Sequence, residues 1–204
     1  MDNEQLYKTI EDFVTGLFKQ INAPALVFHN LSHTQNVVKR TLEMAKHCKL
    51  SENERFVVFA AAWFHDTGHL FTEPHMHEVK SCDIMSKFLW NKVNDADIVS
   101  DIEECIMATK FPTSPQKLVQ QILCDADTYH LGTDEFKETN KLVMQERMLK
   151  QGYIDTAEFN MDAIGMLEQH RFYTDYCKDC LNEKKEGNLQ ELKNRIKNGR
   201  QNCA

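Results

Sequence analysis

The sequence predicts an all-α protein, on three observations. Glycine and proline are rare, with 7 and 4 occurrences in 204 residues; apolar residues recur at helical spacing along most of the chain; and 42% of residues are hydrophobic against 27% charged. Glycine and proline together average about 12% of residues, and a sandwich or barrel of many short strands needs them in its turns. A chain this poor in turn formers, yet apolar enough to build a core, favours a bundle of helices.

Charge and composition narrow the functional classes. The formal net charge is −7. Proteins that bind nucleic-acid polymers present a basic face, so we expect no such partner, although a local pocket can still attract a small phosphorylated ligand. No apolar run approaches the roughly 18 residues of a membrane span, and the start of the chain lacks a signal-peptide pattern. With seven scattered cysteines as well, the sequence predicts a reduced cytoplasmic protein that contacts no membrane, and it leaves the oligomeric state open.

Helical periodicity places the elements in order along the chain. Helices are expected near residues 6–21, 32–47, 52–64, 79–89, 98–106, 118–127, 133–151 and 155–181. A break near Arg171 is left open in the last of these, a loop is expected over residues 68–75, and the polar tail after Lys184 is expected to form a short surface helix. No repeat, low-complexity stretch or linker interrupts the chain, so residues 1–204 are predicted to form a single domain.

The third of these helices carries the most information. Ser51 and Glu54 have the spacing of a capping box, which marks the start of a helix. Residues 56–64 are apolar nearly all round, which is typical of a helix in the middle of a bundle. His65 and Asp66 are therefore expected at the end of a buried helix, where the chain leaves the core.

Three features of the chain offer ligands for a divalent metal ion: His33, the pair His65-Asp66, and an aspartate at 125 or 127. Imidazole nitrogen and carboxylate oxygen suit borderline or hard divalent metals. Asp66 ends an apolar helix, and Asp125 and Asp127 follow an apolar run, where an ionised carboxylate is costly unless a cation or hydrogen bonds compensate it. Each residue taken singly is as readily explained as a helix cap or a solvated side chain, and the residues alone do not distinguish Asp125 from Asp127.

The order of these residues and their flanks resemble a known family. Three segments, residues 28–34 (FHNLSHT), 60–69 (AAAWFHDTGH) and 125–127 (DAD), resemble the YHNxxHT, AAxFHDxGH and DAD motifs of the HD superfamily of metal-dependent phosphohydrolases. Two more, residues 108–110 (ATK) and 170–174 (HRFYT), resemble motifs of a subgroup of small bacterial HD proteins. The similarity thus extends over roughly residues 25–175.

The resemblance implies a single HD-domain helical bundle, with its core at about residues 25–175 and a helical C-terminal extension. One divalent metal ion would be held by His33, His65, Asp66 and Asp127. Such an ion lowers the pKa of a bound water and neutralises phosphate oxygens, so the expected activity is hydrolysis of a phosphoester in a small phosphorylated molecule, such as a nucleotide. Four mixed nitrogen and oxygen ligands do not distinguish among Mn, Fe, Co, Ni, Zn and Mg.

Other residues near the motifs receive roles from the same resemblance, each with a plainer alternative. Asp66 and His69 are expected to take part in catalysis, His69 as an acid or phosphate-binding group or, alternatively, as a cap of its loop. Asp125 is expected to orient a ligating histidine. His77, at the start of a helix, is expected in the substrate pocket or at a second metal ion.

Two cations are the candidate phosphate contacts. Lys110 offers an ammonium group, and Arg171 offers a guanidinium group that can bind phosphate with two parallel hydrogen bonds. An exposed lysine and a helix-end arginine are the alternatives. Tyr129 and His130, just after the DAD segment, are expected to line the same cavity or to pack between helices.

The expected number of metal ions depends on a long segment of the chain that contains no histidine. Two-metal members of the superfamily take further histidines from the two helices after the HD pair, whereas this chain has none between residues 78 and 126. We therefore expect one metal ion and no di-iron oxygenase chemistry. Two alternatives to hydrolysis stay open: a module that binds a nucleotide or metal without turnover, and an iron-dependent oxygenase.

Overall fold

The computed structural model describes residues 3–201, and the side chains of residues 4–197, and it confirms the all-α prediction. The α-helices are α1 (Asn3–Gln20), α2 (Leu31–His47), α3 (Glu52–Phe64), α4 (His77–Leu89), α5 (Ala96–Ala108), α6 (Leu118–Asp127), α7 (Phe136–Gln151), α8 (Thr156–Gln169) and α9 (Asp175–Gln201). Three short 3-10 helices are η1 (Thr67–Leu70), η2 (Pro74–Met76) and η3 (Tyr129–Gly132). Within residues 3–201, no helix has the length and apolar character needed to cross a membrane.

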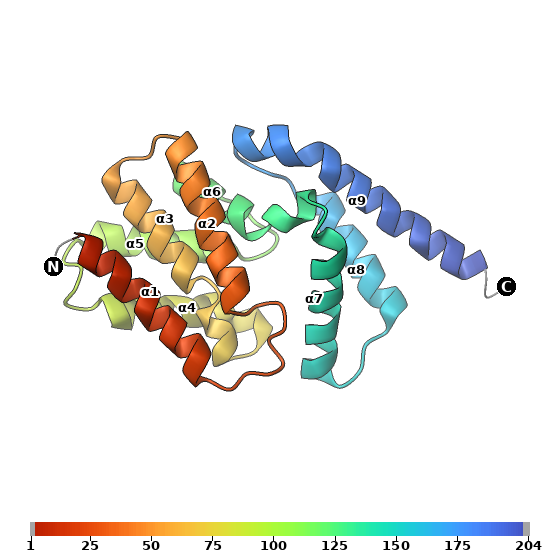
Figure 1. The fold of residues 1–204 in the computed structure, drawn as a ribbon, viewed down its shortest axis with the longest axis horizontal. Coiled ribbons are helices and arrows are strands. Elements are labelled where there is room, and N and C mark those ends of the chain that lie inside the picture. The colour runs from red at the N-terminus through yellow and green to blue at the C-terminus, as the bar shows by residue number, and fades with distance from the viewer. Residues whose placement is uncertain (1–2, 202–204) are drawn as a thin grey trace.

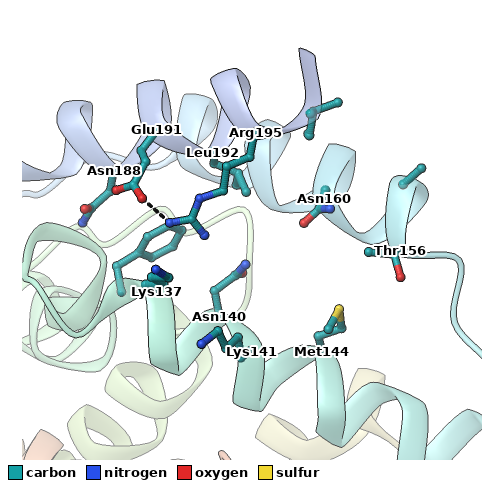
Figure 2. A pocket seen from close by; sticks show the side chains of 13 residues that line it. Lys137, Asn140, Lys141, Met144, Thr156, Asn160, Asn188, Glu191, Leu192 and Arg195 are labelled. Carbon is teal, nitrogen blue, oxygen red and sulfur yellow. Dashed lines mark hydrogen bonds and ion pairs between the residues drawn. The ribbon is translucent and has the colours of Figure 1, made fainter. Parts of the chain in front are cut away.

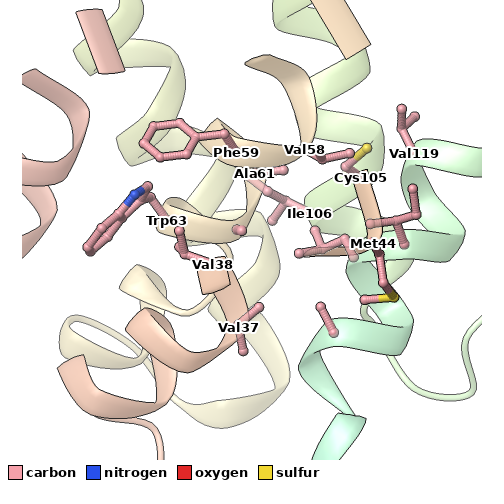
Figure 3. Close-up of a cluster of buried hydrophobic side chains, with 14 of the residues drawn as sticks. Val37, Val38, Met44, Val58, Phe59, Ala61, Trp63, Cys105, Ile106 and Val119 are labelled. Atoms are coloured by element: carbon pink, nitrogen blue, oxygen red, sulfur yellow. The ribbon is translucent and has the colours of Figure 1, made fainter. Parts of the chain in front are cut away.

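Helix α3 is the centre of the bundle formed by α1 to α6 (Figure 1). Its last eight residues are all buried. Figure 3 shows Val58 and Ala61 of this helix near Met44 of α2, Ile106 of α5 and Val119 of α6. An apolar helix surrounded in this way removes side chains from water on every face, which stabilises the fold by about 25 cal/mol for each Å² of apolar surface buried.

The start of α3 is the capping box that the sequence predicts. The Ser51 hydroxyl accepts a hydrogen bond from the Glu54 backbone N–H at 3.3 Å, and the Glu54 carboxylate accepts one from the Ser51 N–H at 2.8 Å. Two N–H groups that the helix itself leaves without a partner are thereby satisfied.

The chain from α4 lies directly against the turn that follows α3. A Cβ at Gly68 would come within 2.0 Å of the His77 carbonyl oxygen, so only glycine permits this approach. The Ser81 hydroxyl donates to the His65 carbonyl at 2.6 Å and accepts from the Gly68 N–H at 2.8 Å. The predicted loop over residues 68–75 is therefore a tight turn containing η1 and η2, and it brings His77 to the end of α3.

Helices α7, α8 and α9 lie together beside this bundle, with α9 extending along one edge of the molecule (Figure 1). The break near Arg171 exists, since residues 170–174 separate α8 from α9. The prediction of a separate short surface helix after Lys184 was wrong, because α9 continues without interruption to Gln201. Leu189 and Leu192 are buried, and Asn188 donates hydrogen bonds from Nδ2 to the carbonyl oxygens of Leu131 and Thr133, where η3 ends. A few apolar residues on one side are enough to hold a mostly polar helix against its neighbours.

Candidate metal centre

The first ligand candidate is placed by the start of α2. Asn30 precedes that helix, and its Oδ1 accepts hydrogen bonds from the N–H groups of Ser32 at 2.9 Å and His33 at 3.2 Å. Asn30 Nδ2 donates to the Val27 carbonyl at 2.8 Å, which holds the cap in position. His33 therefore lies in the first turn of α2, with its ring turned toward the ends of α3 and α6.

The HD pair ends α3 inside the protein. His65 is fully buried, and its Nδ1 donates to the Ala62 carbonyl at 2.8 Å. Because a carbonyl can only accept, Nδ1 keeps its proton, and Nε2 is the nitrogen whose lone pair becomes available to a metal when the ring is neutral. Asp66 follows, only 3% exposed.

The four predicted ligands meet at one point. His33 Nε2 lies 3.1 Å from Asp127 Oδ1 and 3.3 Å from Asp66 Oδ2. His65 Nε2 lies 3.3 Å from the same Asp66 oxygen and 3.6 Å from Asp127 Oδ1. One donor atom each from His33, His65 and Asp127 falls within 4.8 Å of the others, close enough for all three to coordinate one ion.

The electrostatics of this cluster favour a positive charge between the carboxylates. Burial alone lowers the pKa of His33, but its contacts with Asp127 and Asp66 raise it to about 9. Burial also lowers the pKa of His65, but Asp66 and Asp127 outweigh this effect and raise that pKa well above its ordinary value. Against the effect of burial, the two histidines hold the pKa of both Asp66 and Asp127 far below the usual range. Both carboxylates are thus ionised in a buried place.

These residues fit a divalent metal ion. Asp66 Oδ2 and His65 Nε2 are buried, and neither makes a hydrogen bond within the described part of the chain. Buried polar atoms without partners are costly, and a cation would satisfy both atoms at once. Two imidazole nitrogens and two carboxylate oxygens form the mixed donor set that several divalent metals accept.

A second group of donors surrounds the other oxygen of Asp66. Atoms of His29, Asp66 and His69 lie within 4.8 Å of one another. His77 Nε2 and His69 Nε2 lie 3.7 and 3.9 Å from Asp66 Oδ1. The His69 ring is stacked between the other two, with ring centroids 4.3 Å from His29 and 3.9 Å from His77. The prediction of one metal ion rested on the absence of histidines between residues 78 and 126, whereas all the histidines of this second group precede that range.

The structure gives His69 a buried position against Asp66 and no role as a cap. Both of its ring nitrogens are buried without a hydrogen-bond partner. Burial is the main cause that lowers the pKa of His69 to about 3, so the ring is neutral near pH 7. A neutral ring suits a ligand or a hydrogen-bonding group better than a proton donor.

Glu146 of α7 is a residue of the site that the sequence analysis missed. It is 3% exposed, and its Oε2 accepts hydrogen bonds from the N–H groups of Phe28 at 2.9 Å and His29 at 3.0 Å. Its Oε1 lies 2.7 Å from His29 Nδ1 and 2.9 Å from Lys150 Nζ. Burial raises its pKa, but His29 and Lys150 outweigh this and hold the carboxylate ionised. Glu146 thereby orients the His29 ring; no local pattern signals a contact across 117 residues.

A cavity of about 280 Å³ opens onto the first donor group. His33 and Asp127 line it, and so do Tyr129 and His130, as the sequence analysis expected in one of its two alternatives. Its basic residues are Lys39 and Arg40 of α2, neither of which the sequence analysis singled out; their only signal was their position about two turns after His33. Arg40 lies over the Tyr129 ring at 4.3 Å.

The two cations predicted to contact phosphate lie elsewhere. Lys110 is exposed after α5, and Arg171 is exposed with its guanidinium 5.4 Å from the Tyr173 ring. Neither residue lines the cavity that opens onto His33 and Asp127. Their role in substrate binding stays a prediction.

Asp125 does not orient a ligating histidine, and that expectation was wrong. Its carboxylate accepts hydrogen bonds from the N–H groups of Tyr173 and Thr174, both at 2.8 Å, and from the Thr174 hydroxyl at 2.7 Å. Two residues along a helix point about 200° apart, so Asp125 faces the segment before α9 while Asp127 faces the histidines. Asp125 therefore holds the fold together on the opposite side of α6.

Comparison with known proteins agrees with these observations. Residues 30–132, just over half of the chain, match the protein family described as HD domain, and all four predicted metal ligands lie in this segment. No curated protein matches the chain.

Two solved structures share the fold. One, from an uncultured Thermotogales bacterium and described as a predicted HD superfamily hydrolase, is 19% identical with a TM-score of 0.55, over 97% of this chain and 92% of that one. The other, from Lactobacillus plantarum, is 17% identical with a TM-score of 0.66, over 96% of this chain and 98% of that one. At these identities the likeness concerns the fold alone.

The raised pKa of His33 predicts pH-dependent metal binding. The ring carries a proton below about pH 9, and that proton must leave before Nε2 can bind a metal. Affinity for Mn²⁺ should therefore rise between pH 6.5 and 8.5, by about tenfold per pH unit for each proton released. Calorimetric titration in buffers of different ionisation enthalpy measures that release directly. Equal affinity at both pH values, with no proton released, would contradict the prediction.

Proposed function

Because this chain belongs to the HD domain family, we propose that it is a metal-dependent phosphohydrolase that cleaves a phosphoester of a small phosphorylated molecule such as a nucleotide. The observation that carries this proposal is the position of the first donor group. His33, His65, Asp66 and Asp127 converge, and two of them, His33 and Asp127, line a cavity that Lys39 and Arg40 also line. A metal ion and a phosphate group can therefore meet there.

The residues around this point have different roles in the proposed hydrolysis. When bound, a divalent ion supplies an activated water and charge neutralisation for the phosphate oxygens. Lys39 and Arg40 supply positive charge along the wall of the cavity. The planar Arg40 group, fixed between Glu43 at 2.8 Å and the Tyr129 ring, can bind phosphate oxygens in a defined direction.

We assign the proton transfer to the leaving group to His29. Glu146 Oε1 lies 2.7 Å from His29 Nδ1 and fixes the ring, so that Nε2 is the nitrogen left to transfer a proton to the departing oxygen. The His29 ring is stacked on His69, and it lies beside Asp66. Glu146 is a positioning residue in this scheme, since it acts through His29.

A second candidate function is the iron-dependent oxygenase. It gains support from the second donor group, because His29 and His69 could hold another ion that shares Asp66 with the first. Elemental analysis of protein purified without chelator or metal-affinity tag separates the two functions. About one Mn, Fe, Co, Ni or Zn per chain supports the hydrolase, and two irons per chain favours the oxygenase.

Removal of a metal ligand tests the proposed function. His65→Ala and Asp66→Ala should each lower both metal content and phosphoester turnover by more than about 100-fold, since even residues that only support a ligand cost 10–100-fold when lost. His75→Ala, at an exposed histidine of η2, is the matched control and should change neither. Full turnover by metal-free His65→Ala protein would refute the proposal.

Glu146→Gln tests the role of His29. The amide keeps an acceptor for the backbone N–H groups but removes the negative charge, so kcat should fall by about 10²–10⁴ while metal content stays the same. KM should stay close to the wild-type value, because the substitution affects the proton-transfer step and not the cations that line the cavity. Glu138→Gln alters an exposed carboxylate of the same helix, paired only with Lys141, and serves as the control. An unchanged kcat, or a loss that appears in KM alone, would exclude the positioning role.

Substitution of the candidate phosphate contacts separates the two sets of cations. Arg40→Gln should raise KM by about tenfold or more, since hydrogen bonds to charged groups contribute about 1.5–3 kcal/mol. If Lys110 and Arg171 bind substrate, as the sequence analysis predicted, their glutamine variants will raise KM instead. Steady-state kinetics with the best substrate of a phosphoester screen decides between them, and an increase caused by Lys110→Gln alone would count against the cavity.

A further inference from the structure

A second cavity lies against α7, α8 and α9, away from the metal centre. Its volume is about 650 Å³, within the range of about 300–1,000 Å³ typical of small-molecule sites. Figure 2 shows Lys137 and Lys141 of α7 facing Leu192 and Arg195 of α9 across it, with Asn160 of α8 at its side. None of its lining residues belongs to either donor group.

Helix α7 separates this cavity from the one at the metal centre. Thr139 and Leu142 line the cavity that opens onto His33 and Asp127. The second cavity is lined by other positions of the same helix, among them Asn140 and Met144. One helix is thus a wall of both cavities, and its Glu146 also holds His29.

The inner surface of the second cavity is apolar. Phe136 and Leu192 are buried in its walls, the latter only 6% exposed, and Met144 and Ile196 are half-buried beside them. Asn188 is buried as well and donates both of its amide hydrogens to η3, which leaves its Oδ1 without a hydrogen bond among the described residues. A ligand that fills this space must therefore offer mainly hydrocarbon surface.

The rim of the cavity is positive in a chain whose net charge is −7. Its charged lining residues are three cations, Lys137, Lys141 and Arg195, and one carboxylate, Glu191. Arg195 pairs with Glu191 and Lys141 with Glu138, while Lys137 has no ion pair in the described part of the chain. Local positive charge against an overall negative chain attracts an anion.

We propose that this cavity binds a small amphiphilic anion. Its apolar body would lie against Phe136 and Leu192, and its carboxylate, phosphate or sulfonate group would lie beside Lys137 and Arg195. Because α7 is a wall of both cavities, the bound anion also alters the surroundings of His29. Binding itself is independent of the proposed hydrolase activity, so either can fail without the other.

A fluorescent fatty-acid probe tests the chemical class of the ligand. Dansyl-undecanoate should bind with a rise in fluorescence, and decanoate should displace it. Decanol has the same body without the charge and should be at least tenfold weaker, whereas inorganic phosphate has charge without the body and should not compete. Equal displacement by decanol and decanoate would overturn the assignment of an anion, and no probe binding would overturn the site.

Two folded variants locate the site. Lys137→Glu combined with Arg195→Glu should weaken decanoate binding at least tenfold, and Ala157→Trp should do so by filling the cavity from α8. Lys8→Glu combined with Lys87→Glu makes the same change of charge at exposed lysines elsewhere and should leave binding unchanged. Circular dichroism confirms that each variant is folded. Wild-type affinity in both cavity variants would place the ligand elsewhere and refute the proposal.

The coupling through α7 has its own readout. Decanoate should shift the ring resonances of His29 in ¹H–¹⁵N spectra of the intact protein, and Ala157→Trp should abolish that shift. His75, exposed in η2, is the internal control and should not respond. Binding without any change at His29 would disprove the coupling and leave the site itself intact.

Discussion

The carboxylate of Asp66 makes the contacts on which the arrangement of the surrounding helices depends. It lies at the end of an apolar helix, almost without access to water, and is held in its charged form. A buried charge is tolerated only when partners surround it. One oxygen contacts His33 and His65, and the other lies near His69 and His77. The start of α2, the end of α3 and the start of α4 must therefore come together at this point.

The same constraint explains why neighbouring residues perform different tasks. Asp127 completes the ring of charges, whereas Asp125, on the opposite side of α6, anchors the segment before α9 through backbone hydrogen bonds. Helix α7 joins the arrangement through Glu146, which has the His29 ring and two backbone N–H groups as partners. The candidate metal centre, the proposed proton donor and the remote cavity are thus connected by one helix.

Much of this arrangement could be predicted before the structure. The helices of the bundle follow from apolar spacing, and the Ser51 capping box locates the start of the central one. The metal ligands follow from residue type, order and resemblance to the HD family, because their motifs are local in sequence. The Glu146 partner of His29 could not be predicted, since a carboxylate in an otherwise exposed helix looks like any solvated one. The continuous α9 was missed because its polar composition hid a single buried side.

By itself, the sequence determined the helical fold class and the residues able to bind a metal, since periodicity and ligand chemistry are properties of short segments. Tertiary structure alone decided what Asp125 binds, how many histidines surround Asp66, and which cations line the cavity. These are matters of direction and distance between helices that are far apart in the chain. Packing of the whole core sets those directions, and no local pattern records them.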